Sequence, residues 1–420
     1  MKGFILIDSA AQGRIAKVLE NKGLRLLLGI LNQDGEEARI AGGAVRNALI
    51  GESISDVDIA TTCLPDEVRK RAEAAGFKAV PTGIEHGTLT IVVEGIPHEV
   101  TTLRADVAAD GRRAEVAFGR DWQTDAERRD FTVNGLYADK HGKVIDLVGG
   151  IADIKSRTIR FIGDPEARIR EDHLRILRFF RFFAWYGKGR PDAEGLKACA
   201  RLKESVNQLS AERIWSELKK LLSAPDPSRA LLWMRQSGVL TVALPESGKW
   251  GIDALHGLVA AERDMSWKAD PLLRLMAVVP PHSVRMEELS RRLKLAKTER
   301  ARLEKWAGAI LPKPDLDSRE FARQLYWGDP AALTDRLRLA LASACAPAAG
   351  DDRKMMKAAG FSRLLELALA WKKPRFPLKG ADLLAAGAAA GPEVGERLKA
   401  LEQKWADADF SLTKDELLKS

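Results

Sequence analysis

The stretch AGGAVRNALIGESISDVDIATT, residues 41–62, combines a glycine pair, an arginine and two aspartates one residue apart. Its first part predicts a strand, a tight turn and then a helix. Gly42 and Gly43 allow close approach of the backbone, and a helix N-terminus favours anions. Arg46, one turn into that helix, can hold a phosphate through its fork of donors. The stretch therefore predicts a phosphate-binding turn, although a glycine pair alone is more often structural and the spacing fits neither a Walker A loop nor GxGxxG.

Asp56 and Asp58 lie in a run that predicts a strand. Successive side chains of a strand alternate between its faces, so both carboxylates should point the same way, roughly 6.5–7 Å apart. Two such charges repel unless a cation lies between them, and ligands that are all oxygen suit Mg²⁺. Glu99 lies on a second predicted strand, and if the strands are neighbours three carboxylates converge. Without that third acid, a solvated turn is the commoner explanation of the pair.

The composition suggests a soluble globular protein with more than one domain. The chain has 420 residues, 45% of them hydrophobic and 30% charged. A net charge of +8 makes nucleic acid a plausible partner without demanding one. Three widely separated cysteines argue against zinc and a disulfide framework, and fit a reducing cytoplasm. No apolar run is long enough for a signal peptide or a membrane span, so no membrane partner is expected.

The order of sequence patterns predicts an α+β fold, with a small mixed-sheet head followed by a large all-helical region. One helix is expected over 9–32, and residues 65–77 should form another between the strands of the head. From about Pro165 the strand signals stop. We expect a helical extension at 1–36, the head at 37–160, a helical neck at 161–225, and a helical body and tail at 226–420.

Five motifs follow one another between residues 37 and 187, and together they carry a family resemblance. The segment GGAVRNALIG…DVDIATT resembles the head motif of class II CCA-adding tRNA nucleotidyltransferases and bacterial poly(A) polymerases, within the polymerase-β-like nucleotidyltransferase superfamily. In the same order, HGTLTIVV…HEVTTLRAD, RRDFTVNGLYAD, DLVGGIADI and REDHLRILRFFRF are similar to later motifs of that family. The head is thereby identified as a nucleotidyltransferase head. The helical region beyond 187 matches only in general character.

The resemblance implies an activity. It is the addition of C, C and A to the 3′ end of tRNA from CTP and ATP, with Mg²⁺ and no nucleic-acid template, by attack of the 3′-hydroxyl on the α-phosphate. Carried over by motif, Asp56 and Asp58 would bind the metals, and Glu99, placed by the strand pattern above, is the third candidate for the catalytic set. Gly42, Gly43 and Arg46 would hold the triphosphate region. The nucleotide would also meet Arg129, with Asp130 and Asn134 near the sugar or supporting the turn.

The segment REDHLRILRFFRF, residues 170–182, is expected to form one helix that selects the base. Asp172, Arg175 and Arg178 follow at steps of three and form a stripe, from which Arg181 drifts round the helix. A carboxylate accepts from an exocyclic amine and a guanidinium donates to ring acceptors, so Asp172 and Arg175 can imitate the pairing edge of a base. The resemblance implies that this is how C and then A are chosen. A face of ion pairs is the alternative.

The polar segment 105–127 resembles the flexible loop that complete CCA-adding enzymes use when they switch from C to A. Arg112 and Arg113 are its candidate residues, and a disordered surface loop is the alternative. Asn47 stands where the family usually has aspartate, which puts in doubt an ion pair with Arg46 or a neighbour.

Several activities remain open at this point. A poly(A) polymerase and a CC-only or A-only enzyme share the motifs. A non-catalytic RNA-binding protein and a small-molecule nucleotidyltransferase are alternatives of a different class. The expected partners are CTP, ATP and the tRNA acceptor end, with no DNA. The helical region would grip tRNA by shape and phosphate contacts, through basic faces in 211–220 and 289–306.

Overall fold

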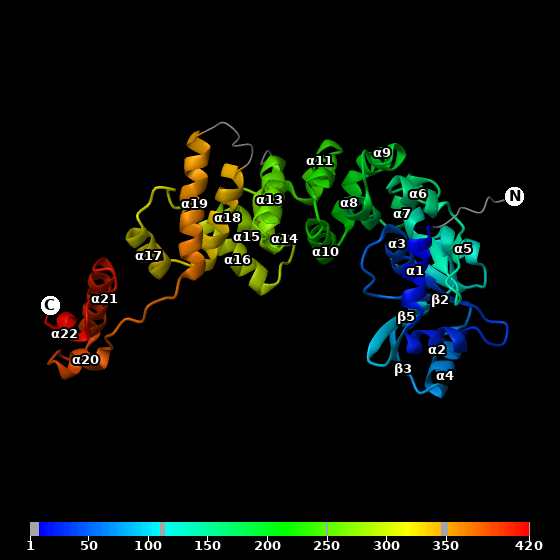
Figure 1. The fold of residues 1–420 in the computed structure, drawn as a ribbon, viewed down its shortest axis with the longest axis horizontal. Coiled ribbons are helices and arrows are strands. Elements are labelled where there is room, and N and C mark those ends of the chain that lie inside the picture. Colours follow the sequence, from blue (N-terminus) through cyan, green and yellow to red (C-terminus); the bar gives the residue numbers. More distant parts are fainter. Residues whose placement is uncertain (1–7, 110–113, 249–250, 346–351, 420) are drawn as a thin grey trace. The chain divides into compact units, whose positions relative to one another are not determined.

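The computed structural model describes residues 8–109, 114–248, 251–345 and 352–419. The chain forms two compact units. The first comprises the residues up to 210 together with 233–243, and the second comprises 211–232 together with the residues from 244 on. Within the described ranges every strand belongs to the first unit, and the second unit is built of helices (Figure 1). The predicted α+β fold, with a sheet-containing head before a helical region, is therefore confirmed.

A seven-stranded mixed sheet in the order β3-β4-β5-β2-β1-β8-β9 forms the head. Strands β2 and β5 run parallel, and the other neighbouring pairs run antiparallel. The strands are β1 (Ala38–Ala41), β2 (Asp58–Thr61), β3 (Lys78–Gly83), β4 (Thr88–Val93), β5 (Ile96–Thr102), β8 (Leu136–Ala138) and β9 (Val144–Asp146). A separate antiparallel pair is formed by β6 (Arg104–Ala109) and β7 (Ala114–Phe118).

Alternation of side chains decides which face of the sheet is covered. In β4, Leu89, Ile91 and Val93 are buried while the residues between them are partly exposed. Helix α4 (Pro65–Ala74) packs on β3, β4 and β5, and helix α2 (Lys22–Leu31) packs on β1, β4 and α4. The other face of β5 carries Glu99 and Thr101, and it is left open to a pocket.

The predicted single helix over 9–32 is wrong, because the chain forms two helices there. Helix α1 (Ser9–Val18) ends at Leu19, and α2 begins after Asn21. The Asn21 side chain accepts from the backbone N–H of Leu24 at 2.8 Å and so caps the new helix. The helix expected at 65–77 is confirmed as α4, with Pro65 in its first turn and Gly76 after its end at φ +79°.

The remaining helices of the first unit surround and extend the head. They are α3 (Gly43–Ile50), α5 (Trp122–Glu127), α6 (Gly150–Ser156), α7 (Pro165–Glu171), α8 (Leu174–Tyr186), α9 (Ala193–Arg201) and α12 (Val239–Ala243), with short 3₁₀ turns η1 (Ile84–His86), η2 (Thr132–Asn134) and η3 (Lys203–Gln208). Aromatic side chains join η2 to α8, since the ring centroids of Phe131 and Phe182 lie 5.1 Å apart. This packing holds α8 against the residue that precedes η2.

Two clusters of buried hydrophobic side chains lie among the later helices of the second unit. One gathers side chains of α17, α18 and α19, including Phe321, Leu337 and Leu364, and the other gathers the C-terminal helices around Trp405. The elements of this unit are α10 (Ala211–Leu222), η4 (Pro245–Ser247), α13 (Ile252–Asp264), α14 (Pro271–Val278), α15 (Ser283–Arg292), α16 (Lys297–Gly308), α17 (Ser318–Trp327), α18 (Pro330–Cys345), α19 (Asp352–Ala370), α20 (Gly380–Ala385), α21 (Pro392–Asp407) and α22 (Lys414–Leu418), while α11 (Ser228–Gln236) crosses the boundary. Among the described helices, none is both long and apolar enough to cross a membrane.

Candidate active site

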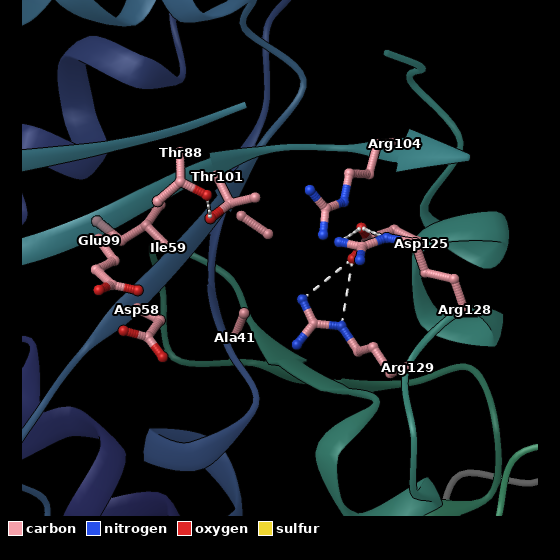
Figure 2. Close-up of a pocket in the computed structure, with 11 residues that line it drawn as sticks. Ala41, Asp58, Ile59, Thr88, Glu99, Thr101, Arg104, Asp125, Arg128 and Arg129 are labelled. Carbon is pink, nitrogen blue, oxygen red and sulfur yellow. Dashed lines mark hydrogen bonds and ion pairs between the residues drawn. The ribbon is translucent and has the colours of Figure 1, made fainter. Parts of the chain in front are cut away.

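A pocket of about 220 Å³ lies over the open face of β2 and β5. Figure 2 shows the carboxylates of Asp58 and Glu99 on one side of it and three arginines on the other. The residues that line it are Ala41, Asp58, Ile59, Ala60, Thr88, Glu99, Thr101, Arg104, Asp125, Arg128 and Arg129. The pocket therefore has an acidic wall made by strands and a basic wall made by residues that follow them in the chain.

The acidic wall depends on the parallel pairing of β2 with β5. Ile59 is level with Val100, which brings Asp58 beside Glu99. The two strands are therefore neighbours, which was the condition for these carboxylates to converge. The pocket walls displace water from Asp58 and raise its pKa to about 6, and the charges of Glu99 and Asp56 add to the rise while Arg129 opposes it. Asp58 thus lies where negative charge has accumulated beyond what the fold neutralises.

Asp56 differs from the prediction in one respect, because β2 begins only at Asp58. Asp56 lies two residues before the strand, is exposed, and accepts a hydrogen bond from the Ser55 hydroxyl at 3.1 Å. Its charge nevertheless reaches Asp58.

The donor chemistry of this wall fits Mg²⁺, which is usually held by one or two carboxylates together with water and phosphate oxygens. Among the described residues no group of three or more His, Cys, Asp or Glu side chains could hold a metal ion by itself.

The basic wall is organised by Asp125, a buried carboxylate of α5. It receives Arg128 at 2.6 Å, Arg129 at 3.1 Å and the hydroxyl of Tyr137 at 2.7 Å. Burial alone would raise the pKa of Asp125, but the two arginines and the Tyr137 hydroxyl outweigh it and hold that pKa below its usual range. Arg129 was predicted for the site, whereas Arg104 and Arg128 were missed. They lie within quoted motifs, but nothing in their spacing separates them from ordinary surface arginines.

Gly42 and Gly43 form the turn between β1 and α3, as predicted. Gly42 has φ +60°, and an added Cβ would lie 3.2 Å from Nη1 of Arg129. Its N–H donates to the carbonyl of Leu136 at 2.8 Å. Gly42 is thus required by both its backbone conformation and the close approach of Arg129. At Gly43 an added Cβ would meet Arg46 Nη2 at an ordinary 3.7 Å, so space alone does not demand glycine there.

Arg46 is buried, and its guanidinium is held by neutral partners. Nε and Nη2 donate to Oδ1 of Asn47 at 3.2 and 3.0 Å. Nη1 donates to Oδ1 of Asn134 at 2.5 Å, and Nη2 also donates to the Tyr186 hydroxyl at 2.9 Å. Burial lowers the pKa of Arg46 below its ordinary value. The guanidinium lies over the Tyr186 ring at 4.2 Å, so Arg46 joins α3 to the end of α8.

Asp130 and Asn134 continue this connection. Asn134 Nδ2 donates to Asp130 Oδ1 at 2.9 Å, and Arg178 Nε donates to Asp130 Oδ2 at 2.7 Å. Asp130 is 8% exposed and also accepts from the N–H of Phe131. The side chains of Arg46, Asn134, Asp130 and Arg178 therefore form one chain of hydrogen bonds from α3 through η2 to α8. Asp130 and Asn134 thus connect η2 to α3 and α8, and their role toward a nucleotide stays a prediction.

The predicted single helix over 170–182 is wrong, because the chain breaks between α7 and α8. Asp172 has extended backbone angles, φ −149° and ψ 107°, and its Oδ1 accepts from the N–H of Leu174 at 3.1 Å. Arg175 lies in the first turn of α8 and donates to Glu171 at 2.5 Å. Asp172 therefore precedes the helix rather than lying on its face, since its side chain competes for the backbone.

Of the remaining predicted site residues, Arg181 lies within the described part of the chain, and the two loop arginines do not. Arg181 lies on α8 with its guanidinium 4.2 Å from the centroid of the Phe182 ring. Arg112 and Arg113 lie outside the described residues.

Comparison with known proteins gives consistent matches. Residues 38–160 match the poly A polymerase head domain, and residues 190–249 match the domain described as "Probable RNA and SrmB- binding site of polymerase A". The mitochondrial CCA tRNA nucleotidyltransferase 1 of Mus musculus is 34% identical over 410 residues, which cover 95% of this chain and 90% of the mouse protein. The CCA-adding enzyme of Geobacillus thermodenitrificans is 42% identical over 224 residues, covering 52% of this chain and 54% of that enzyme. The crystal structure of the Bacillus stearothermophilus CCA-adding enzyme with CTP superposes with a TM-score of 0.71 at 29% identity, over 92% of this chain and 93% of that one.

Proposed function

The chain belongs to the family of CCA tRNA nucleotidyltransferases, and on that premise we propose that it adds C, C and A to the 3′ end of tRNA, using CTP and ATP. The observation that carries the proposal is the pocket itself. An acidic wall of Asp58 and Glu99 faces a basic wall of arginines, and both are supplied by the matched head domain. Such a pocket suits the binding of a nucleoside triphosphate and the release of its pyrophosphate.

The basic wall would bind the triphosphate. Arg104, Arg128 and Arg129 bring three guanidinium groups to one side of the pocket, and Asp125 fixes two of them by ion pairs. Arginine donates two parallel N–H bonds to phosphate oxygens, so a wall of this kind orients the chain of phosphates as well as neutralising it. The turn at Gly42 lets Arg129 lie close to the backbone.

The acidic wall would hold Mg²⁺ through Asp56 and Asp58. A bound ion would lower the pKa of the attacking 3′-hydroxyl and neutralise the departing pyrophosphate. Glu99 keeps the wall negative from the neighbouring strand and raises the pKa of Asp58. Burial is the main cause of the raised pKa of Asp58 and the charges of Glu99 and Asp56 add to it, so a divalent cation bound there would offset both the lost water and the like charges.

Helix α8 would select the base. Nε of Arg178 donates to Oδ2 of Asp130 at 2.7 Å, so the carboxylate of Asp130 orients this guanidinium without a bound nucleotide. Asp172 lies at the break before α8 and Arg175 in its first turn, which sets the two at the N-terminal end of the helix. We assign Asp172, Arg175, Arg178 and Arg181 to recognition of the base.

Extension of tRNA transcripts tests the proposal. Three transcripts that end before CCA, after C and after CC are incubated with labelled CTP or ATP and Mg²⁺, and the products are separated on gels. We expect stepwise completion to CCA and then a stop. A stop after CC or continued addition of A would instead assign a CC-only enzyme or a poly(A) polymerase, and binding without extension would overturn catalysis.

We further propose that the enzyme acts in a reducing compartment, the cytoplasm. Cys63 and Cys199 are buried free thiols, which suits such a compartment. The similar mouse protein is mitochondrial by name, so the compartment is to be tested by fractionation of cells that express the full chain. Recovery of the chain with organelles would overturn this assignment without touching the activity.

A further inference from the structure

A buried histidine of β5 lies directly behind the acidic wall. His98 is 4% exposed, and its Nδ1 lies 3.1 Å from the carbonyl oxygen of Val57. Val57 separates Asp56 from Asp58, so this hydrogen bond reaches the backbone between the two proposed metal ligands. A carbonyl oxygen only accepts, which requires the proton of the neutral ring to be on Nδ1.

The hydrogen bond replaces strand pairing where that pairing ends. Ile59 is level with Val100, and two residues back along both strands are Val57 and His98. The named strand β2 begins only at Asp58, so Val57 lies outside it. Residues 52–57 have no regular secondary structure. The His98 side chain thus holds this otherwise irregular segment to β5 at the position from which the two aspartates project.

The other ring nitrogen shows that packing does not explain the histidine. Nε2 of His98 is buried and has no hydrogen-bond partner among the described residues. A buried acceptor without a partner is unfavourable, and an apolar side chain of similar size would avoid it. Of the two ring nitrogens, Nδ1 is therefore the one whose hydrogen bond offsets the burial of the imidazole.

We propose that His98 is a positioning residue for the metal site, because it fixes the Val57 carbonyl and thereby the spacing of Asp56 and Asp58. The inference rests on the proposed metal-binding role of these aspartates. Partners that orient metal ligands typically change metal affinity or activity by about 10–100-fold when they are removed. His98 is not among the residues that line the pocket, so its effect should reach the site through the backbone and appear first in metal binding.

The same strand supplies a matched control at its other end. Thr102 lies on the same buried face of β5, and its hydroxyl donates to the carbonyl of Cys63 at 2.8 Å. This bond also joins a β5 side chain to the backbone beside β2, but it lies past the end of β2 that is far from the acids. Thr102→Val removes one buried hydrogen bond without touching the metal-binding segment.

The test measures Mn²⁺ affinity by electron paramagnetic resonance, with no nucleotide present, and hydrogen exchange in peptides covering residues 52–60. His98→Leu should weaken Mn²⁺ binding at least about tenfold and speed exchange in these peptides. His98→Asn should stay within about threefold of the wild type, since its amide nitrogen takes the place of Nδ1, whereas His98→Gln places its donor at Nε2 and should behave like leucine. Thr102→Val should bind Mn²⁺ as the wild type does.

Each contrary result has a distinct meaning. Unchanged Mn²⁺ affinity in His98→Leu, or equal loss in His98→Asn and His98→Gln, overturns the positioning role. Equal loss in Thr102→Val overturns it as well, because the effect would then be general destabilisation. If His98→Leu does not fold, the asparagine and glutamine pair still decides the question. Asp58→Asn serves as the reference, since wild-type Mn²⁺ affinity in that variant would overturn the proposed metal site itself rather than the role of His98.

Discussion

Two pairs of aspartates in the head differ in their charged neighbours, and their pKa values differ accordingly. Asp58 lines an open pocket, and Asp56 is an exposed residue two positions before it in the chain. The pKa of Asp58 is raised to about 6 by burial and, in addition, by the neighbouring carboxylates. Asp125 and Asp130 are buried, yet arginines hold their pKa values below the usual range against the effect of burial. Exposure alone would predict the reverse order of the pKa values, so the partners decide it.

The difference separates scaffold from site. Each buried aspartate already has its cations within the protein, Arg128 and Arg129 for Asp125 and Arg178 for Asp130. Asp58 instead has Glu99 and Asp56 as charged neighbours that raise its pKa, and Arg129 opposes them without outweighing them. An acid that the fold leaves uncompensated is one whose cation comes from solution. Substitutions should therefore separate the two pairs, with activity lost at one and stability lost at the other.

The largest effect is expected for Asp58→Asn. It removes a proposed metal ligand, and loss of several kcal/mol of transition-state stabilisation corresponds to roughly a thousandfold or greater fall in the rate of CMP addition. Single-turnover extension of a tRNA transcript at saturating CTP measures it. Asp58→Asn with more than a tenth of the wild-type rate would contradict the proposed role.

The same substitution should stabilise the protein when no metal is present. The pKa of folded Asp58 lies above its ordinary value of 3.8, so the folded state binds a proton that the unfolded state has lost between these pH values. Wild-type stability therefore falls as pH rises from about 4 to 6, and Asp58→Asn should lack that fall. Thermal melts in EDTA at pH 4.5 and 7 should show the variant gaining over the wild type at pH 7. If the stability of both proteins depended on pH in the same way, the pKa of Asp58 would not be raised in the folded state.

Asp125→Asn should have the reverse signature, with a large loss of stability. It leaves Arg128 and Arg129 without their shared carboxylate, and breaking a buried ion pair from one side lowers the free energy of unfolding by about 3 kcal/mol. Urea denaturation followed by circular dichroism measures the loss. Asp121→Asn is the control on the same helix, because Asp121 is its N-cap and asparagine caps as well. Equal midpoints for the two variants would refute the comparison.

Patterns of side chains predicted the acidic wall but could not predict the basic one. Alternation fixed the strand face on which Asp58 and Glu99 each lie, and the parallel pairing of β2 with β5, which the strand patterns left as a condition, brings the two together. Arg104 comes from the start of β6 and Arg128 from the end of α5, and no period links these segments. Their convergence depends on how the chain folds back, which spacing does not encode.

The two predictions of a single continuous helix were wrong for a local reason. Over 9–32 and 170–182 the apolar residues keep helical spacing through the break, so the pattern predicts one continuous helix. Asn21 and Asp172 each bind a nearby backbone N–H through the side chain instead. These side chains offer the backbone an alternative to the helix, and only their cap-forming chemistry signalled it.

A smaller effect is expected at Tyr186, which sharpens the comparison for the arginines. Tyr186→Phe removes the hydroxyl that accepts from Arg46 and keeps the ring beneath the guanidinium. Loss of one hydrogen bond to a charged group should lower the free energy of unfolding by about 1.5 kcal/mol and raise KM for both nucleotides severalfold. Tyr326→Phe, which removes a bond to Glu402 in the second unit, is the control and should leave KM unchanged. An unchanged KM in Tyr186→Phe would show that Arg46 does not help to hold the nucleotide.

The smallest effect is expected for Asn47→Asp, which tests the rule that partners decide. Arg46 has two neutral amide partners and a lowered pKa, whereas Arg129 has Asp125 and a raised one. A carboxylate at 47 would strengthen two bonds from Arg46 but would lose the donor to the Ser53 carbonyl, so the net gain at pH 7 should be only about 0.5 kcal/mol. The arginine would hold the pKa of the new aspartate low, and its contribution should therefore disappear as the pH falls through that pKa. Urea midpoints at pH 7 and 3.5 decide it. A gain that persists at the lower pH would have to come from shape rather than charge, and Arg46 would then need no counter-ion at all.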